Sequence, residues 1–207
     1  MANLLTVSIL RTSQKTNLYI DMGKFKFNET HIEGVYIIEP TVYGDHRGYF
    51  METYNSEEFK AAGLNYDFVQ DNQSSSRCGV LRGLHFQKAH PQAKLVRVLS
   101  GEVFDVAVDL RSGSPTYGQW EGVLLSAENK KQFMIPRGFA HGFVVVSETA
   151  EFAYKCDELY HPEDEGGLIY NDPQVGIQWP KVGEVILSEK DTKNPSLDEL
   201  PSNLFIL

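Results

Sequence analysis

Residues 102–109 read EVFDVAVD, and from Phe104 onward this stretch alternates between apolar and more polar positions. Successive side chains of an extended strand point to opposite faces of a sheet. The apolar face holds Phe104, Val106 and Val108, and the other face holds Asp105, Ala107 and Asp109. We therefore predict a strand whose second face is polar enough to line a cavity.

Short β-branched or aromatic stretches recur between turn signals along the chain. They are Val35–Glu39, Tyr49–Tyr54, Val80–Phe86, Leu95–Leu99, Val103–Leu110, Gly122–Leu125, Gln132–Ile135, Phe143–Val146 and Glu151–Cys156. Many short strands at near-regular spacing are typical of an all-β sandwich or barrel. One surface helix is predicted over Ser56–Ala62, with Asn55 as its cap, Glu58 completing a capping box and Gly63 ending it.

The composition is that of an ordinary folded protein, with 207 residues, 42% of them hydrophobic and 23% charged. We predict a single domain over residues 22–207, preceded by an N-terminal extension of unknown role over residues 1–21. The net charge of -9 argues against a nucleic-acid or anionic-membrane binder, so an anionic ligand requires a local cluster of cations. Two cysteines outside any zinc-ligand spacing, and no apolar run near the roughly 20 residues that span a bilayer, favour a cytoplasmic protein.

Two histidines lie in sequence contexts that suggest chemistry. Residues 136–141 read PRGFAH, and this Pro-x-Gly-x-x-His pattern resembles the second motif of the cupin superfamily of β-barrels. Metal-binding cupins also carry His-x-His on an earlier strand, because side chains two residues apart face the same ion. Here that stretch reads His85-Phe86-Gln87, so one ligand is missing. A metal-dependent cupin, with Gln87 as a poor ligand, stays a minor alternative.

A longer series of motifs resembles the dTDP-4-dehydrorhamnose 3,5-epimerases, a metal-free, homodimeric branch of the cupins. The matches run in family order from about Phe27 to Pro195. They are GDHRGYF at 44–50, FVQDN at 68–72, VLRGLHFQ at 80–87, KLVR at 94–97, GEVFDVAVD at 101–109, GFAHGF at 138–143, YK at 154–155 and LSEKD at 187–191. The resemblance implies an antiparallel jelly-roll barrel of the cupin type with a few short peripheral helices. It also implies no cofactor, and a homodimer in which an N-terminal strand can join the partner's sheet.

The substrate implied by the resemblance is a dTDP-4-keto-6-deoxyhexose. Its carbons C3 and C5 flank the C4 ketone, so a base can remove either proton to give an enolate, and a donor on the opposite face inverts the centre. The resemblance assigns His85 as the base, Asp191 as its carboxylate partner, Tyr154 as the donor and Lys94 as the cation near the ketone. Residues expected to bind substrate are Arg47, Glu52, Gln70, Asn72, Arg82, His141, Glu165 and Lys190.

Arg82 and His85 have opposite parity on a regular strand, so both face one pocket only if Gly83 permits a bulge or bend. Three alternatives to the 3,5-epimerase stay open at this point. The same groups serve an enzyme that inverts only C3 or one that moves the ketone, and a non-catalytic cupin could bind a sugar nucleotide. The joint presence of His85, Asp191 and Tyr154 counts against the last, because binding alone needs no acid and base.

Overall fold

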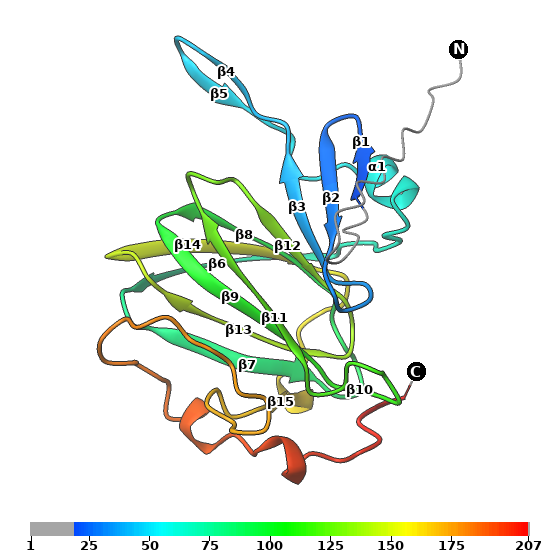
Figure 1. Cartoon of the computed structure of the whole chain (residues 1–207), viewed down its shortest axis with the longest axis vertical. Helices are drawn as coiled ribbons and strands as arrows, with labels where there is room; N and C mark the ends of the chain where they lie inside the picture. Colours follow the sequence, from blue (N-terminus) through cyan, green and yellow to red (C-terminus); the bar gives the residue numbers. More distant parts are fainter. Residues whose placement is uncertain (1–18, 207) are drawn as a thin grey trace, which may run out of the picture.

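The computed structural model describes residues 19–206, which form two antiparallel sheets that face each other as a jelly-roll barrel (Figure 1). The predicted all-β fold is therefore confirmed. The larger sheet has the strand order β1-β2-β3-β12-β8-β14-β6. Its strands are β1 (Tyr19–Met22), β2 (Phe25–Glu29), β3 (Tyr36–Pro40), β12 (Gln132–Ile135), β8 (Lys94–Ser100), β14 (Thr149–Cys156) and β6 (Gln70–Arg77).

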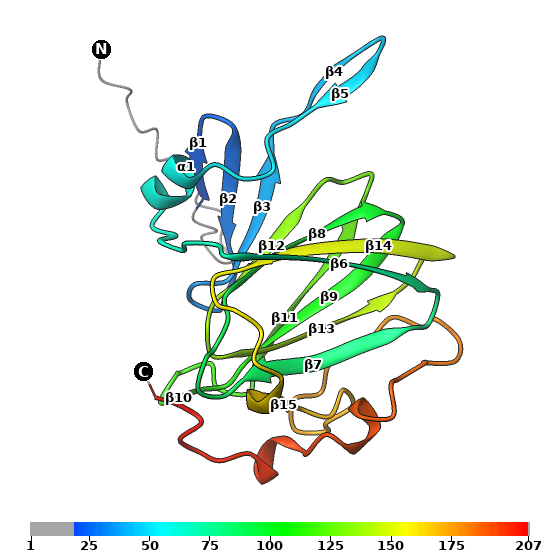
Figure 2. The ribbon, with the colours of Figure 1, turned by 180° about the vertical axis from the view of Figure 1, so that it is seen from behind.

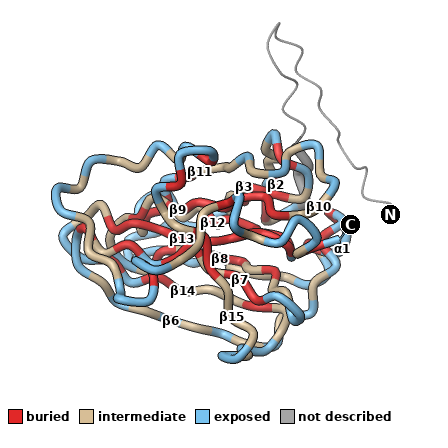
Figure 3. Tube along the Cα trace, turned by 90° about the horizontal axis from the view of Figure 1, so that it is seen from below, coloured by how far each residue is buried: buried red, intermediate tan, exposed pale blue. Residues whose placement is uncertain are grey.

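The smaller sheet has the order β11-β9-β13-β7-β15 and lies below the larger one (Figure 2). Its strands are β11 (Trp120–Ser126), β9 (Glu102–Asp109), β13 (Phe139–Val145), β7 (Leu81–Gln87) and β15 (Glu165–Gly167). Phe133 and Phe152 of the larger sheet pack with Val103, Leu125 and Phe143 of the smaller sheet in one buried cluster. Buried strands run through the middle of the molecule (Figure 3), which gives the barrel a rigid, close-packed interior.

A helix packs on the outer face of the larger sheet. It is α1 (Ser56–Ala61), and Asn55 caps it by accepting the backbone N–H groups of Glu57 and Glu58, as predicted. Phe59 of α1 is buried against Phe25 and Phe27. The predicted capping box is wrong, because the Glu58 carboxylate accepts the backbone N–H of Lys24 instead.

The C-terminal part of the chain covers the outer face of the smaller sheet. Its short elements are η1 (Pro162–Asp164), η2 (Asp191–Lys193), η3 (Leu197–Glu199) and β16 (Phe205–Ile206), and β16 pairs with β10 (Arg111–Ser112). Leu168, Val175 and Leu197 pack in one cluster with Val106 and Val108, the apolar face predicted for residues 102–109. This cover carries η2, and with it Asp191, to the edge of β7.

The sequence patterns missed seven of the described strands, among them β1, β2 and β6, and overextended another. The missed strand β6 reads QDNQSSSR and lacks the apolar residues that identify a strand, while β1 and β2 precede the first predicted strand. The predicted strand Tyr49–Tyr54 is shorter, since β5 (Gly48–Phe50) pairs with β4 (Tyr43–Asp45) in a hairpin that projects from the barrel (Figure 1). The boundary predicted at residue 22 falls within β1, and residues 1–18 of the predicted extension lie outside the described residues.

Strand β7 contains the bulge predicted at Gly83. His85 pairs with His141 and Arg82 pairs with Phe143. Two residues of β7, Gly83 and Leu84, therefore lie opposite the single residue Gly142 of β13. Gly83 has a backbone φ of +116°, which residues with a side chain rarely adopt. A Cβ built on it would lie 2.6 Å from the Cα of Gly142. The extra residue cancels the opposite parity, and Arg82 and His85 both line one cavity.

We expect Gly142→Ala to lower the free energy of unfolding by about 2 kcal/mol, because its Cβ would lie 2.5 Å from the carbonyl oxygen of Arg82 and force the two strands apart. Urea unfolding followed by circular dichroism measures the change. Gly44→Ala is the control, since its Cβ would meet nothing nearer than 3.8 Å. Equal stability of the two variants would show that the close approach of β7 and β13 is not a constraint.

Candidate active site

A cavity of about 620 Å³ opens between the two sheets and the C-terminal cover. It brings together eight of the twelve residues predicted for the site. They are Asn72 from β6, Arg82 and His85 from β7, Lys94 from β8, His141 from β13, Tyr154 from β14, and Lys190 and Asp191 from the C-terminal segment. Residues far apart in the chain therefore meet in one chamber, as a catalytic site requires.

His85 and Asp191 form a hydrogen-bonded pair in this cavity. The Nε2 atom of His85 lies 2.6 Å from Oδ1 of Asp191, and the Asp191 side chain is 4% exposed. Burial acts to raise the pKa of Asp191, but the hydrogen bond and attraction from His85, with further hydrogen bonds from neighbouring groups, outweigh it and lower the pKa. Asp191 is therefore a carboxylate at neutral pH, placed to orient the imidazole and to stabilise its protonated form.

The anchoring of the C-terminal segment explains how Asp191 reaches β7. Ile186 donates its backbone N–H to Gly79 and accepts the N–H of Leu81, which fixes the segment beside the start of β7. The backbone N–H of Asp191 then donates to the hydroxyl of Ser188. These local bonds hold the Asp191 carboxylate within hydrogen-bond distance of the His85 ring.

Tyr154 and Lys94 lie on the larger sheet, across the cavity from β7. Strands β14 and β8 are neighbours, and Tyr154 pairs in register with Val96, two residues from Lys94. Burial raises the pKa of Tyr154 to about 12, so its hydroxyl keeps its proton at neutral pH. Burial lowers the pKa of Lys94, while Cys156, Asp105 and Glu165 act in the opposite direction.

His141 forms a second buried pair with Asp105, the polar residue of the strand pattern in residues 102–109. Its Nε2 atom lies 2.9 Å and 3.0 Å from the two carboxylate oxygens. Burial raises the pKa of Asp105 and lowers the pKa of His141, while their mutual attraction opposes both shifts. The predicted polar face of β9 therefore supports the cavity, because Asp105 fixes the ring of His141.

Gln70 and Glu165 do not line the cavity, but each bonds a residue that does: the side-chain amide nitrogen of Gln70 donates to Oδ1 of Asn72, and Glu165 pairs with Lys190. We call these two residues and Tyr160 the rim of the cavity. Glu165 accepts from Lys190 Nζ at 2.7 Å and from the hydroxyl of Tyr160 at 3.2 Å, and Gln70 Oε1 accepts the backbone N–H of Tyr160. Burial acts to raise the pKa of Glu165, but Lys190 and His85 outweigh it and lower the pKa. Tyr160 was missed from the sequence because it lies in a loop, outside any strand pattern.

Arg47 and Glu52 lie outside the cavity of this chain. Arg47 is at the tip of the projecting hairpin, where it bonds Asp45. Glu52 accepts from Lys24 Nζ and from the side-chain amide of Asn55. Their predicted contacts with substrate therefore stay predictions.

Gln87 occupies the position where metal-binding cupins carry a second histidine, and its side chain is engaged elsewhere. Its amide nitrogen donates to the carbonyl groups of His90 and Leu159, and its oxygen accepts the backbone N–H of His161. Among the described residues, no three His, Cys, Asp or Glu side chains are grouped so that they could hold a metal ion. Nor does any helix in residues 19–206 have the length and apolar character needed to cross a membrane.

Comparison with known proteins agrees with this geometry. The family model described as dTDP-4-dehydrorhamnose 3,5-epimerase matches residues 29–199. The chain belongs to this family. It is 56% identical to the dTDP-4-dehydrorhamnose 3,5-epimerase of Methanothermobacter thermautotrophicus over 182 residues, which cover 87% of this chain and 98% of the relative. The predicted family and enzyme class, an isomerase that acts as a carbohydrate epimerase, are confirmed.

Solved structures of epimerases share the fold. The dTDP-6-deoxy-D-glucose-3,5-epimerase of Legionella pneumophila, solved in complex with dTDP-4-keto-L-rhamnose, has a TM-score of 0.85 at 53% identity and covers 88% of this chain and 97% of its own. A 3′-monoepimerase from Streptomyces bikiniensis, in complex with dTDP-quinovose, has a TM-score of 0.77 at 36% identity, covering 82% and 86%. The same barrel therefore supports single and double epimerisation in different members.

We expect Asp191→Asn to destabilise the protein most at neutral pH. A carboxyl group whose pKa is lowered by folding contributes stability above its unfolded pKa, about 3.9, and loses it as the pH falls through the folded value. The difference in free energy of unfolding between wild type and variant should shrink below about pH 4. Urea unfolding from neutral to acid pH measures it, with Asp67→Asn as the control because that side chain is 91% exposed. A constant difference across the range contradicts the assignment.

Proposed function

We propose that the cavity inverts C3 and C5 of dTDP-4-dehydro-6-deoxy-D-glucose by proton transfer, in the biosynthesis of dTDP-L-rhamnose. One observation supports this most directly. His85 stands on the smaller sheet with Asp191 bonded to it, and the half-buried phenol of Tyr154 stands on the larger sheet that faces it. A base on one wall and an acid on the other are what inversion of a carbon between them requires.

In the proposed step, His85 removes the proton from the carbon next to the ketone. Its Nε2 is bound to Asp191, so the other ring nitrogen, Nδ1, accepts the proton. The electron pair of the C–H bond moves toward the C4 ketone and gives an enolate, which the ammonium group of Lys94 stabilises. Tyr154 then gives its proton to the opposite face of the carbon. His85 releases the proton that it took to solvent and the phenolate regains one, which restores both groups.

Cations at the edge of the cavity suit the diphosphate of the substrate. Arg82 is exposed and lines the cavity, with one donor on the hydroxyl of Ser76 at 3.0 Å, and Lys190 also lines the cavity. These groups supply local positive charge in a protein whose net charge is -9. The predicted substrate contacts of Gln70, Asn72, His141 and Glu165 are then to the sugar and the nucleobase of the substrate.

We propose that the reaction needs no metal or other cofactor. The ketone already acidifies the protons at C3 and C5, so a base, an acid and a cation complete the chemistry. The Gln87 amide, at the position of a cupin metal ligand, is occupied by three backbone groups. Elemental analysis and retention of activity after chelation check this point.

We propose a homodimer, located in the cytoplasm, as the working form. The projecting hairpin exposes three aromatic side chains, with Tyr43 at 53%, Tyr49 at 59% and Phe50 at 66% of their possible surface. Large exposed aromatic side chains close together mark a protein interface. A second copy of the chain that covers them would also bury the hairpin that carries Arg47.

Proton NMR in heavy water tests the proposed function. We expect wild type to exchange deuterium into C3 and C5, and His85→Asn to lose turnover by roughly 10²- to 10⁴-fold while it still binds dTDP. Tyr154→Phe should incorporate deuterium without inversion, because the imidazole returns the deuteron to the face from which it took the proton.

Other patterns of exchange identify the alternatives. Exchange at C3 alone in wild type would indicate a C3-only epimerase, and a change in the position of the ketone would indicate a ketoisomerase. Tight binding of dTDP with exchange at neither carbon would indicate a non-catalytic sugar-nucleotide cupin. Full turnover by His85→Asn would show that the base lies elsewhere.

Sedimentation equilibrium tests the assembly. We expect wild type to have about twice the chain mass of 23.4 kDa. The dimer of the double variant Tyr49→Ser/Phe50→Ser should have a larger dissociation constant than the wild-type dimer, so that it is monomeric at concentrations where wild type is still dimeric. The reason is that burial of each aromatic ring contributes on the order of 1–3 kcal/mol. The control is Leu124→Ser, whose side chain is exposed on β11, outside the hairpin. A monomeric wild type at all concentrations would contradict the proposed dimer.

A further inference from the structure

We propose that Gln87 is a positioning residue that holds residues 158–164 at the rim of the cavity and thereby sets the affinity for substrate. This inference rests on the proposed function, because it concerns how the same cavity binds its ligand. Gln87 follows His85 by two residues at the end of β7 and is 3% exposed. A polar side chain this deeply buried must satisfy its hydrogen bonds inside the protein.

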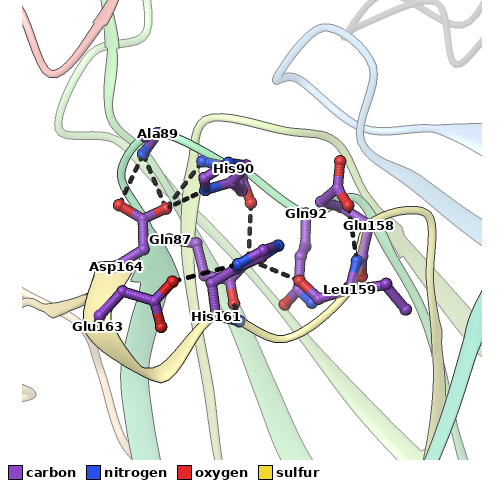
Figure 4. A network of polar contacts seen from close by, with 9 residues as sticks. All are labelled: Gln87, Ala89, His90, Gln92, Glu158, Leu159, His161, Glu163 and Asp164. Atoms are coloured by element: carbon purple, nitrogen blue, oxygen red, sulfur yellow. Dashed lines mark hydrogen bonds and ion pairs between the residues drawn. The ribbon is translucent and has the colours of Figure 1, made fainter.

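The Gln87 amide connects two loops that follow different strands. Its Nε2 donates to the carbonyl of His90 at 2.7 Å and to that of Leu159 at 3.1 Å, and its Oε1 accepts the N–H of His161 at 2.7 Å (Figure 4). The partners on the second loop lie on either side of Tyr160. One side chain therefore fixes the backbone on both sides of Tyr160.

Asp164 closes the same arrangement from the other side (Figure 4). Its carboxylate accepts the backbone N–H groups of Ala89 and His90 and also lies 3.2 Å from Nδ1 of His90. The rings of His90 and His161 stack with centroids 4.1 Å apart. The two loops are thus joined by Gln87 at one end and Asp164 at the other.

The segment held in this way carries Tyr160, which is linked to the cavity lining through Glu165 and Lys190. The hydroxyl of Tyr160 donates to Glu165, and Glu165 accepts from Lys190, which lines the cavity next to Asp191. Glu165 also pairs in register with Gln87 across β15 and β7. A shift of residues 158–161 would move Tyr160 and loosen its bond to Glu165.

The reacting groups are held by other contacts. Asp191 reaches His85 through the C-terminal segment, which is anchored at Ile186, and Tyr154 is fixed within β14. Neither contact passes through residues 158–164. Loss of the Gln87 amide should therefore weaken substrate binding and leave the proton-transfer step unchanged.

The test is Gln87→Leu, which keeps the size of the side chain and removes its three hydrogen bonds, with Gln87→Glu as a second variant that keeps only the bond from His161. We expect Gln87→Leu to raise KM about tenfold while kcat stays within about threefold and the pH profile of kcat is unchanged. Gln87→Glu should raise KM by a similar factor, because its carboxylate faces the carbonyl groups of His90 and Leu159.

A double-mutant cycle separates positioning from general destabilisation. If Gln87 acts through Tyr160, Gln87→Leu in a Tyr160→Ala background should raise KM by less than about twofold beyond Tyr160→Ala alone. Asn129→Leu is the matched control. Its amide also makes three backbone hydrogen bonds, to Ser126, Lys131 and Leu124, in a turn none of whose described residues lines the cavity.

The outcomes distinguish this inference from the proposed function. Wild type without epimerase activity would overturn the proposed function, whatever Gln87 does. Active wild type with an unchanged KM in both Gln87 variants would overturn the positioning role alone. A fall in kcat with an unchanged KM, or a rise in KM equal to that of Asn129→Leu, would also overturn it.

Discussion

The hydrogen bond between His85 and Asp191 is the interaction on which the rest of the structure depends. A carboxylate that is almost fully buried is costly unless it is paired and hydrogen-bonded, and its partner lies 106 residues earlier in the chain. The C-terminal segment must therefore run along the outer face of the smaller sheet and pass beside β7 at Asp191 before it continues to η3 and β16. The packing of Leu168, Val175 and Leu197 on that face stabilises this path through buried apolar surface. The cover of the barrel thus belongs to the active site.

The distribution of charge in the cavity follows from the same constraint. Two buried acids at the cavity each have a histidine partner: Asp191 pairs with His85 and Asp105 with His141. Lys94 has no ion pair of its own among the described residues, and burial lowers its pKa. Burial thus disfavours the charged form of Lys94 in the free protein. In the proposed mechanism an enolate oxygen that forms beside Lys94 favours its ammonium form, because little water separates the two groups.

Local patterns predicted most of the framework, and longer-range contacts account for what they missed. Alternation in residues 102–109 predicted β9 and its polar face, and parity predicted the bulge at Gly83. Strand β6 escaped because an edge strand can be polar on both faces when backbone pairing with β14 holds it. Asp191 has no local signal, since its role depends on the path of the C-terminal segment, and only the resemblance pointed to it. Arg47 lies outside the cavity because the hairpin that carries it projects from the barrel, and Glu52 is bonded to Lys24 and Asn55 instead.

A single acid–base pair can invert only one carbon of the sugar at a time. C3 and C5 lie on either side of the ketone, so in the proposed mechanism each carbon is brought in turn between His85 and Tyr154. The sugar must reorient between the two steps while the nucleotide end stays bound, since release after the first step would yield the singly inverted product. The number of centres inverted therefore depends on how firmly the rim holds the ligand, and only indirectly on the base and the acid. If the proposed substrate contacts of Arg82, Lys190 and Glu165 hold the ligand, these residues, together with Tyr160 and Gln87 that position the rim, decide whether the second inversion follows the first.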